Sequence, residues 1–179
     1  MADVTKEYGK ALYELSVEEN RQPDYLGQIR YLRNLFRDTP ELLALLRAPS
    51  IPKEDRMAVI DRVFANRIEP YLCSFLKLMT KRGHASAILS CLNEYERLWY
   101  EHSGIVVAEV ISAVPLTSLQ KSRLLAKLEA HTGKAVEMRC TLDEQVIGGV
   151  TVMLDGKLLE GSVRGRLDAL REHLDRKTL

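Results

Sequence analysis

The sequence is short of the residues that build metal centres and disulfide frameworks. Among 179 residues there are only three cysteines and four histidines. Cys73, Cys91 and Cys140 are odd in number, widely spaced and set in apolar patterns, so we expect reduced thiols in a hydrophobic core. No histidine forms an HExxH motif or stands at ligand spacing from a cysteine. We therefore expect no metal ion and no cofactor.

An excess of one charge and long apolar runs are also missing. Lys and Arg number 26 and Asp and Glu 25, so the net charge of +1 gives no electrostatic reason to expect nucleic acid or a membrane surface as partner. No apolar stretch approaches the ~20 residues that span a bilayer. The N-terminus "MADVTKEYGKALYEL" also lacks the regions of a signal peptide. We expect no direct membrane insertion, and membrane association only through a partner.

Glycines in "DEQVIGGVTVMLDGKLLEGSVRGRLDAL", residues 143–170, suggest a phosphate-binding loop that lacks its essential side chains. The spacing from Gly156 to Gly161 fits such a loop, but Ser162 and Val163 follow where Lys and then Ser or Thr are required. No side chain at these positions would reach a nucleotide phosphate. The sequence thus gives little support to a nucleotide site.

A β-hairpin followed by a helix explains the same glycines without a ligand. Residues 150–154 alternate like a strand, and the Asp-Gly pair that follows is favoured in two-residue hairpin turns. The chain then returns, and Ser162 can cap a last helix. Gly148 and Gly149 before the strand predict a bulge or a close approach of the backbone.

Other catalytic arrangements are also missing. Glu94, Glu96 and Glu101 lie near one another on an expected helix, but on its polar side, which predicts a solvated face. No GxSxG motif or nucleophilic cysteine context is present. The stretch "EYERLWYEH" mixes aromatic residues with mostly acidic charges, which would repel phosphate. A non-enzymatic interaction protein is favoured over an enzyme or a nucleic-acid binder.

Hydrophobic periodicity divides the chain near Gly104. The first part predicts consecutive helices over about 4–16, from Pro23, from Pro40, through a segment that includes Met57 to Phe64, over about 69–82 and over about 85–102. The second part predicts a strand from Ile105, a helix that starts at the capping box Thr117–Gln120 and ends at Gly133, a strand over 136–142, the hairpin and the last helix. The predicted class is α + α/β, with a six-helix bundle (1–104) and a small β-α-β-β-α domain (105–179).

The strand over 136–142 alternates between apolar and polar residues. We expect four of its side chains to share one face, opposite the polar ones, and these are Val136, Met138, Cys140 and Leu142.

Two local features favour a role in protein–protein contact. Gly9 and Ala11 beside Tyr8 make the first helix narrow enough for another helix to approach closely. Arg164 and Arg166 fall in the first turn of the last helix, where the helix dipole disfavours cations. A broken local rule often marks a functional surface. On physics alone, two solvated arginines explain the pattern equally well.

The segment "VIGGVTVMLDGKLLEGSVRGRLDAL" closely resembles the C-terminal motif of the delta subunit of F-type ATP synthase, the counterpart of the mitochondrial oligomycin-sensitivity-conferring protein. The resemblance extends to "EYGKALYEL" as the first helix, "FLKLMTKRG" as the fifth and "GIVVAEVISAVPL" as the domain junction. Two positions depart from the family pattern. Met153 stands where a basic or polar residue is usual, and Gly9 where alanine is usual.

This resemblance implies a non-catalytic stator subunit that links the catalytic head to the peripheral stalk, so that rotation is coupled to ATP synthesis. It implies one copy per complex, on the cytoplasmic side of the bacterial plasma membrane. Residues 1–104 would hold the N-terminal segment of an alpha subunit between the first and fifth helices, and residues 105–179 would bind the b subunits. The residues alone leave open a helical adaptor of another assembly without catalytic activity.

The resemblance also implies two sets of site residues. The groove for the alpha subunit would consist of Tyr8, Ala11, Leu12, Leu15, Ser74, Phe75, Leu78 and Met79. The stalk-binding or family motif would consist of Gly148, Gly149, Gly161, Arg164, Gly165 and Arg166. Most groove residues could equally belong to the core. Tyr8 and Ser74, which are polar tips in an apolar stripe, are the two that we expect to face a partner.

Overall fold

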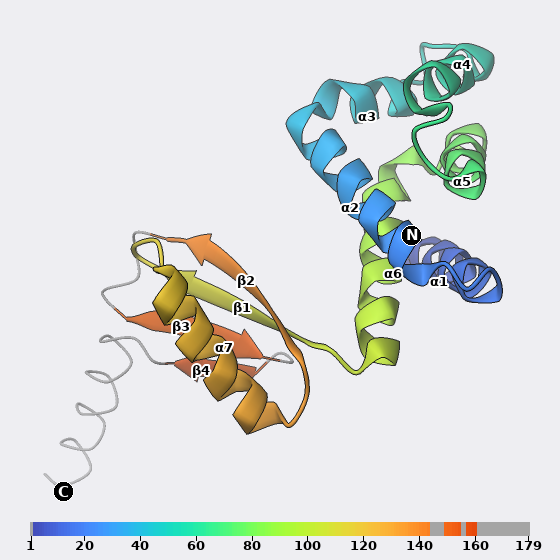
Figure 1. Ribbon diagram of the computed structural model, residues 1–179. Coiled ribbons are helices and arrows are strands. Elements are labelled where there is room, and N and C mark those ends of the chain that lie inside the picture. The colour runs from blue at the N-terminus through green and yellow to red at the C-terminus, as the bar shows by residue number, and fades with distance from the viewer. Residues whose placement is uncertain (1, 144–148, 155–156, 161–179) are drawn as a thin grey trace, which may run out of the picture. The chain divides into compact units, whose positions relative to one another are not determined.

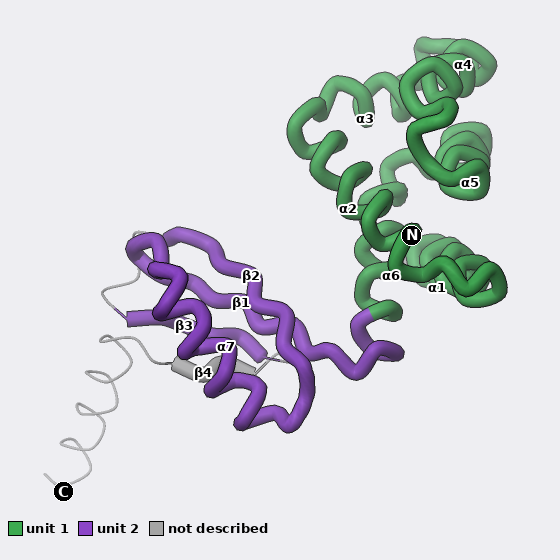
Figure 2. Tube along the Cα trace, in the orientation of Figure 1, with its two compact units in different colours: residues 1–99 green, residues 100–179 purple. Residues whose placement is uncertain are grey.

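A computed structural model describes residues 2–143, 149–154 and 157–160 (Figure 1). This part of the chain is mostly helical, with seven α-helices, one short 3-10 helix and a small mixed β-sheet. The chain divides into two compact units, residues 1–99 and 100–179 (Figure 2). The division falls inside helix α6 (Ile88–Ser103), a few residues before Gly104.

The first unit is built from helices. In chain order they are α1 (Ala2–Glu18), α2 (Gln22–Asp38), α3 (Pro40–Arg47), α4 (Lys53–Phe64), α5 (Pro70–Lys81), the 3-10 helix η1 (Ala85–Ala87) and α6. A proline stands in the first turn of α2, α3 and α5. Backbone N–H groups in the first turn have no acceptor within the helix, so a proline there costs no helical hydrogen bond. Gly83 follows α5 with φ of +76°, a conformation that glycine adopts without strain.

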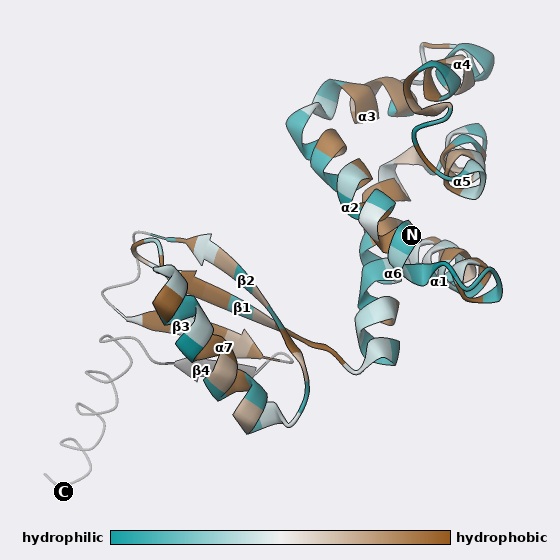
Figure 3. Ribbon diagram, in the orientation of Figure 1, coloured by the Kyte–Doolittle hydropathy of each residue, from teal (hydrophilic) through white to brown (hydrophobic). Residues whose placement is uncertain are grey.

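Aromatic residues form the centre of the first core. The Tyr95 ring of α6 lies 5.5 Å from the ring of Tyr13 in an edge contact and 6.5 Å from the ring of Tyr25 in a stacked one. Phe36 and Phe64 pack 6.3 Å apart elsewhere in the same core. Figure 3 shows hydrophobic and hydrophilic residues alternating along these helices, as expected for helices with one buried side.

The second unit contains β1 (Val106–Ser112), α7 (Ser118–Thr132), β2 (Val136–Leu142), β3 (Val150–Leu154) and β4 (Lys157–Glu160). The strand order is β2-β1-β3-β4. β1 and β2 run parallel and α7 connects them, whereas β3 runs antiparallel to both β1 and β4. Leu128 of α7 packs on this sheet with a core of Val106, Ala108, Val110, Val136, Val152 and Leu154.

Helix α7 begins and ends as its sequence predicted. The Gln120 backbone N–H donates to Thr117 Oγ1 at 3.3 Å, and the Thr117 backbone N–H donates to Gln120 Oε1 at 2.9 Å. This is the predicted capping box. Gly133 ends the helix in the left-handed region with φ of +66°.

Strand β2 departs from its predicted alternation. Val136 is buried, but Cys140 and Leu142 are exposed, Leu142 by 57%. β2 has β1 as its one neighbour in the described sheet, and the residues of β2 in the core cluster are Val136 and Met138, at its start. The alternation predicted which side chains share a face, but not how far along the strand the core reaches.

The cysteines also differ from their prediction as core thiols. Cys91 is fully buried and burial raises the pKa of its thiol to about 11. Cys73 is half-buried, which raises its thiol pKa as well, and Cys140 is exposed. The expectation of three core thiols is therefore wrong for Cys140.

Glu96 was predicted on a solvated face and is instead buried. Its carboxylate accepts a hydrogen bond from Arg30 Nε at 3.1 Å and another from Arg33 Nη1, both from α2. Glu94 is half-buried and Arg97 hydrogen-bonds to it, which lowers the pKa of its carboxyl group. Glu101 is exposed, as expected. The buried carboxylate thus links α6 to α2 and belongs to the scaffold.

Candidate partner-binding surface

The residues predicted for the groove separate into a surface group and a core group. Ala11 of α1 and Ser74 and Leu78 of α5 are exposed, and Tyr8 and Leu15 of α1 are half-buried. We call these five residues the α1/α5 surface. The core group consists of Leu12, Phe75 and Met79.

The polar tips of the α1/α5 surface have different partners. Arg82, directly after α5, donates from Nη1 to the Tyr8 hydroxyl at 3.0 Å, which joins α1 to the end of α5. The Ser74 hydroxyl donates to the Pro70 carbonyl oxygen one turn earlier, at 2.9 Å. A hydroxyl that donates one hydrogen bond can still accept another. The exposed Ser74 oxygen is therefore accessible to a donor on a partner.

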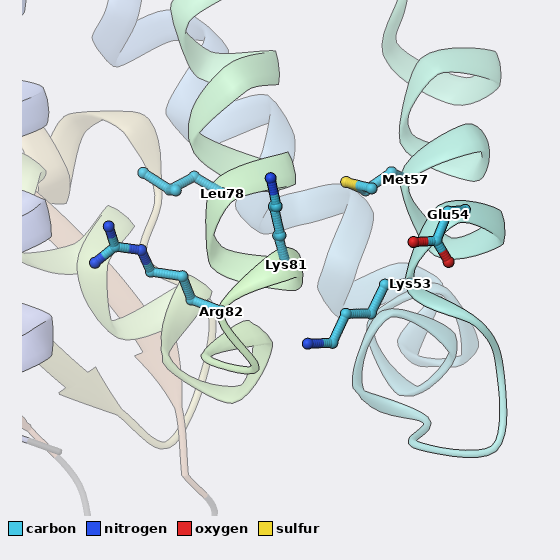
Figure 4. A pocket seen from close by; sticks show the side chains of 6 residues that line it. All are labelled: Lys53, Glu54, Met57, Leu78, Lys81 and Arg82. Atoms are coloured by element: carbon cyan, nitrogen blue, oxygen red, sulfur yellow. The ribbon is translucent and has the colours of Figure 1, made fainter.

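A cavity of about 400 Å³ lies between α4 and α5, next to the α1/α5 surface (Figure 4). Its lining residues are Lys53, Glu54 and Met57 of α4 with Leu78, Lys81 and Arg82 of α5 and its C-cap. In Figure 4 the three α4 side chains point toward α5, whereas Leu78 and Arg82 extend from α5 on the side away from them.

The rim of this cavity is basic. Three cations line it against one carboxylate: Lys53, Lys81 and Arg82 against Glu54. None of these four side chains forms an ion pair with another described residue. One turn away, Lys77 donates to Asp61 at 2.5 Å, which raises the Lys77 pKa. These cations were not predicted from the sequence. Their signal was present, since Leu78, Lys81 and Arg82 are three and four residues apart and share one side of a helix.

The motif assigned to the stalk is described at one position. Gly149 is exposed with φ of +78°, a backbone conformation that favours glycine. The other motif residues, Gly148, Gly161, Arg164, Gly165 and Arg166, lie outside the described residues. The hairpin turn and the last helix lie outside them too. Met153, a departure from the family pattern, is 39% exposed on β3 opposite Glu109.

Three large apolar side chains are exposed near one end of the second unit. Val114 follows β1, Leu119 lies in the first turn of α7, and Leu142 ends β2. Because β1 and β2 are parallel and Ser112 pairs with Leu142, the two strands end together at this edge. We call Val114, Leu119 and Leu142 the strand-end patch. Leu142 was predicted on the apolar face of its strand, and the patch was not predicted from the sequence.

The described residues contain no cluster of three or more His, Cys, Asp or Glu side chains placed to hold a metal ion. Nor does this part of the chain include a helix that is both long and apolar enough to cross a bilayer. The chemistry available at the two surfaces is apolar contact, hydrogen bonding and cationic attraction.

The described residues form a helical unit and a small sheet unit, each with exposed apolar side chains, which is the class of a two-unit protein with surfaces suited to protein contact. Residues 4–174 match the family model of the ATP synthase delta (OSCP) subunit. The chain belongs to this family, as the sequence resemblance indicated.

Relatives along nearly the whole chain agree with this assignment. The chain is 29% identical over 167 residues to the ATP synthase subunit delta of Clostridium perfringens, covering 93% of each chain. It is 29% identical to that of Alkaliphilus oremlandii over 173 residues, covering 97% of this chain and 96% of the relative. A chain in the cryo-EM structure of the Toxoplasma gondii mitochondrial ATP synthase hexamer shares the fold, with a TM-score of 0.74 at 18% identity and coverage of 95% and 96%.

Membership of this family gives the protein its general role. It is a non-catalytic, peripheral subunit of the ATP synthase. Its role is that of a stator subunit, which links the catalytic head to the peripheral stalk. Basic and apolar surfaces are compatible with that role, because a link acts by binding on two sides rather than by converting a substrate.

Proposed function

We propose that the two units of this chain bind different partners within the ATP synthase. The first unit, with α1 to α6 acting as one six-helix bundle, holds the N-terminal segment of an alpha subunit of the catalytic head. The second unit binds the b subunits of the peripheral stalk. One copy serves each complex, at the cytoplasmic side of the bacterial plasma membrane.

The observation that carries the first assignment is the α1/α5 surface. Ala11 and Leu78 expose apolar area, and the small Ala11 side chain lets a docked helix approach the α1 backbone closely. An amphipathic helix in a groove needs such an apolar strip between two helices. The buried Leu12, Phe75 and Met79 support this strip from the core and do not themselves meet the partner.

The basic rim beside Leu78 favours a segment that carries acidic side chains. Lys53, Lys81 and Arg82 have no carboxylate partner among the described residues, so each is available to an incoming acid. Such exposed pairs contribute only about 0–1 kcal/mol each, but they set orientation and association rate. Binding should therefore weaken as the salt concentration rises.

The second assignment is supported by the strand-end patch. Val114, Leu119 and Leu142 offer apolar contact at one edge of the second unit. We keep Arg164 and Arg166 as proposed contacts for the acidic or carbonyl-rich end of the stalk. Replacing both arginines with glutamine should weaken stalk binding, most visibly at low salt, while leaving the melting temperature nearly unchanged.

A reciprocal pair of variants tests the two assignments in the complete chain. Leu78→Glu places a charge on the α1/α5 surface, and Leu119→Glu makes the same change in the strand-end patch. Binding of a labelled alpha-subunit N-terminal peptide and of the soluble part of the b subunits is measured by fluorescence anisotropy. We expect Leu78→Glu to weaken peptide binding by roughly tenfold or more, since one buried apolar side chain contributes about 1.5–3 kcal/mol.

Leu119→Glu should leave peptide binding unchanged and weaken binding of the b subunits by a similar factor. Each variant is thus the control for the other. The reverse pattern would show that the units have exchanged roles. Loss of neither interaction in either variant would place both partners elsewhere on the chain.

A further inference from the structure

We propose that the first unit has a binding site for a small oxyanion where α3, α4 and η1 meet. A cavity of about 150 Å³ lies there, and no residue of the α1/α5 surface lines it. Its lining residues are Leu46, Arg47, Arg56, Gly83, Ala85 and Ser86. This site is independent of which partners the two units bind.

Arg56 is the residue on which the site depends. Its side chain lies on the inner side of α4 and the residue is only 7% exposed. Nη1 donates to the carbonyl oxygen of Leu46, near the C-terminal end of α3, at 3.0 Å. Nε is buried and has no acceptor among the described protein groups. A single carbonyl bond orients the guanidinium but does not neutralise its charge.

A buried cation without a carboxylate partner is unusual. Arginine side chains that leave water are normally paired, because an uncompensated buried charge is costly. Within the described residues Arg56 has no ion pair with an acidic side chain. An anion that enters the cavity would accept from Arg56 and compensate its charge.

A second arginine lines the same cavity. Arg47, in the last turn of α3, is exposed and likewise has no carboxylate partner in the described part of the chain. Two like charges at one small cavity repel each other, and an anion between them converts this repulsion into attraction. The lining contains no acidic residue, and the Ser86 hydroxyl is a further possible donor.

The size of the cavity limits the ligand. Sites for drug-sized ligands and cofactors are usually about 300–1,000 Å³, so a cavity of 150 Å³ is too small for a nucleotide. A phosphate ion or a single carboxylate group presents several oxygens to the planar guanidinium fork within a small volume. The shared chemistry is that of a small oxyanion, and its two sources are free phosphate and a carboxylate.

Titration of the complete chain with inorganic phosphate tests the site. Binding is followed by isothermal calorimetry and by chemical-shift changes of arginine side-chain N–H signals, at constant ionic strength set with chloride. We expect saturable binding of phosphate, with the Arg56 Nε–H signal among those that shift. A parallel titration with acetate shows whether a carboxylate occupies the same site and moves the same signals.

Two variants and a matched control decide whether these arginines hold the anion. Arg47→Gln should weaken binding by roughly tenfold, the value of one charge-assisted hydrogen bond, and Arg56→Lys should weaken it by more. Arg62→Gln removes an exposed arginine of α4 that does not line the cavity, and should leave affinity unchanged. Arg47 is exposed, so its replacement keeps the test valid even if Arg56→Lys does not fold. Binding that does not saturate, or that is equal in Arg47→Gln and Arg62→Gln, would overturn the proposal.

Discussion

Gly9 lies on the side of α1 that contacts α6. A Cβ at this position would stand 2.7 Å from Cβ of Glu94 and 2.9 Å from the carbonyl oxygen of Cys91. Side chains in a packed interior do not tolerate such distances without displacement. Gly9 was interpreted from the sequence as part of a surface for a partner protein, but the helix that approaches it closely is α6 of the same chain. The departure from the family alanine at Gly9 thus has a structural reason within this protein.

Gly9→Ala should lower the free energy of unfolding by up to about 2 kcal/mol, because overpacking costs about 1–3 kcal/mol and a helix-propensity gain of about 1 kcal/mol offsets part of it. Gly27→Ala is the matched control, since Gly27 lies in α2 with nothing within 4 Å of an added Cβ. It should raise stability by about 0.5–1 kcal/mol. Urea unfolding followed by the fluorescence of the single tryptophan, Trp99, measures both. Equal stabilisation by the two alanines would contradict the contact at Gly9.

Tyr95 makes the free energy of unfolding depend on pH in the alkaline range. Burial raises the pKa of Tyr95 to about 12, from 10.0 for a free tyrosine. The folded state therefore favours the neutral phenol, and stability is full below pH 10 and declines as pH rises toward 12. The hydroxyl lies 2.8 Å from Ser16 Oγ and 3.1 Å from the Gln22 carbonyl oxygen, which holds it in the core.

Tyr95→Phe should cost about 1–2 kcal/mol at pH 8, because buried acceptors lose their donor. Between pH 10 and 12 the variant should lose about 2 kcal/mol less stability than the native chain, since phenylalanine has no proton to release. Urea unfolding at both pH values gives the comparison. Parallel stability curves for the two proteins would show that Tyr95 ionises as freely in the folded state as in the unfolded one.

At the scale of elements, helix positions could be predicted because their signals are local. The stripes of apolar residues, the opening prolines and the capping box at Thr117 all lie within a few residues of the element that they define. The burial of Glu96 could not be predicted in this way, because it depends on Arg30 and Arg33, which are more than 60 residues away in sequence. The exposure of Cys140 depends on strand order, which alternation alone does not give.

The link between α2 and α6 has a direct consequence for stability. Glu96→Gln should lower the free energy of unfolding by about 1–3 kcal/mol. This is less than the loss for a fully buried ion pair, because water can solvate the guanidinium groups of Arg30 and Arg33 once the carboxylate is gone. Their side chains are 41% and 30% exposed. Glu14→Gln, which affects an exposed pair with Lys10 on α1, should cost about 0.5 kcal/mol or less. Similar small losses in both variants would show that the buried link contributes little.

At the scale of the whole molecule, the family could be predicted from sequence but the accessible site could not. The quoted motifs led to the delta-subunit family, and the family match over residues 4–174 confirms it. The groove prediction named Leu12 and Met79, which are core residues, and omitted Lys81 and Arg82, which line the adjacent cavity. Helical spacing shows which residues share a side of α5, but only the packing of α4 and α1 shows which of them reach solvent.

Reconstitution tests the stator link most directly. Membranes from the source organism are stripped of the catalytic head and of this subunit, and the head is then returned with or without the purified chain. Proton-driven ATP synthesis and the amount of head that sediments with the membranes are measured together. A stator link predicts that coupled synthesis returns only when the chain is present, because the head otherwise has nothing to hold it against the rotor. Full recovery of coupled synthesis without the chain would contradict its role as the link.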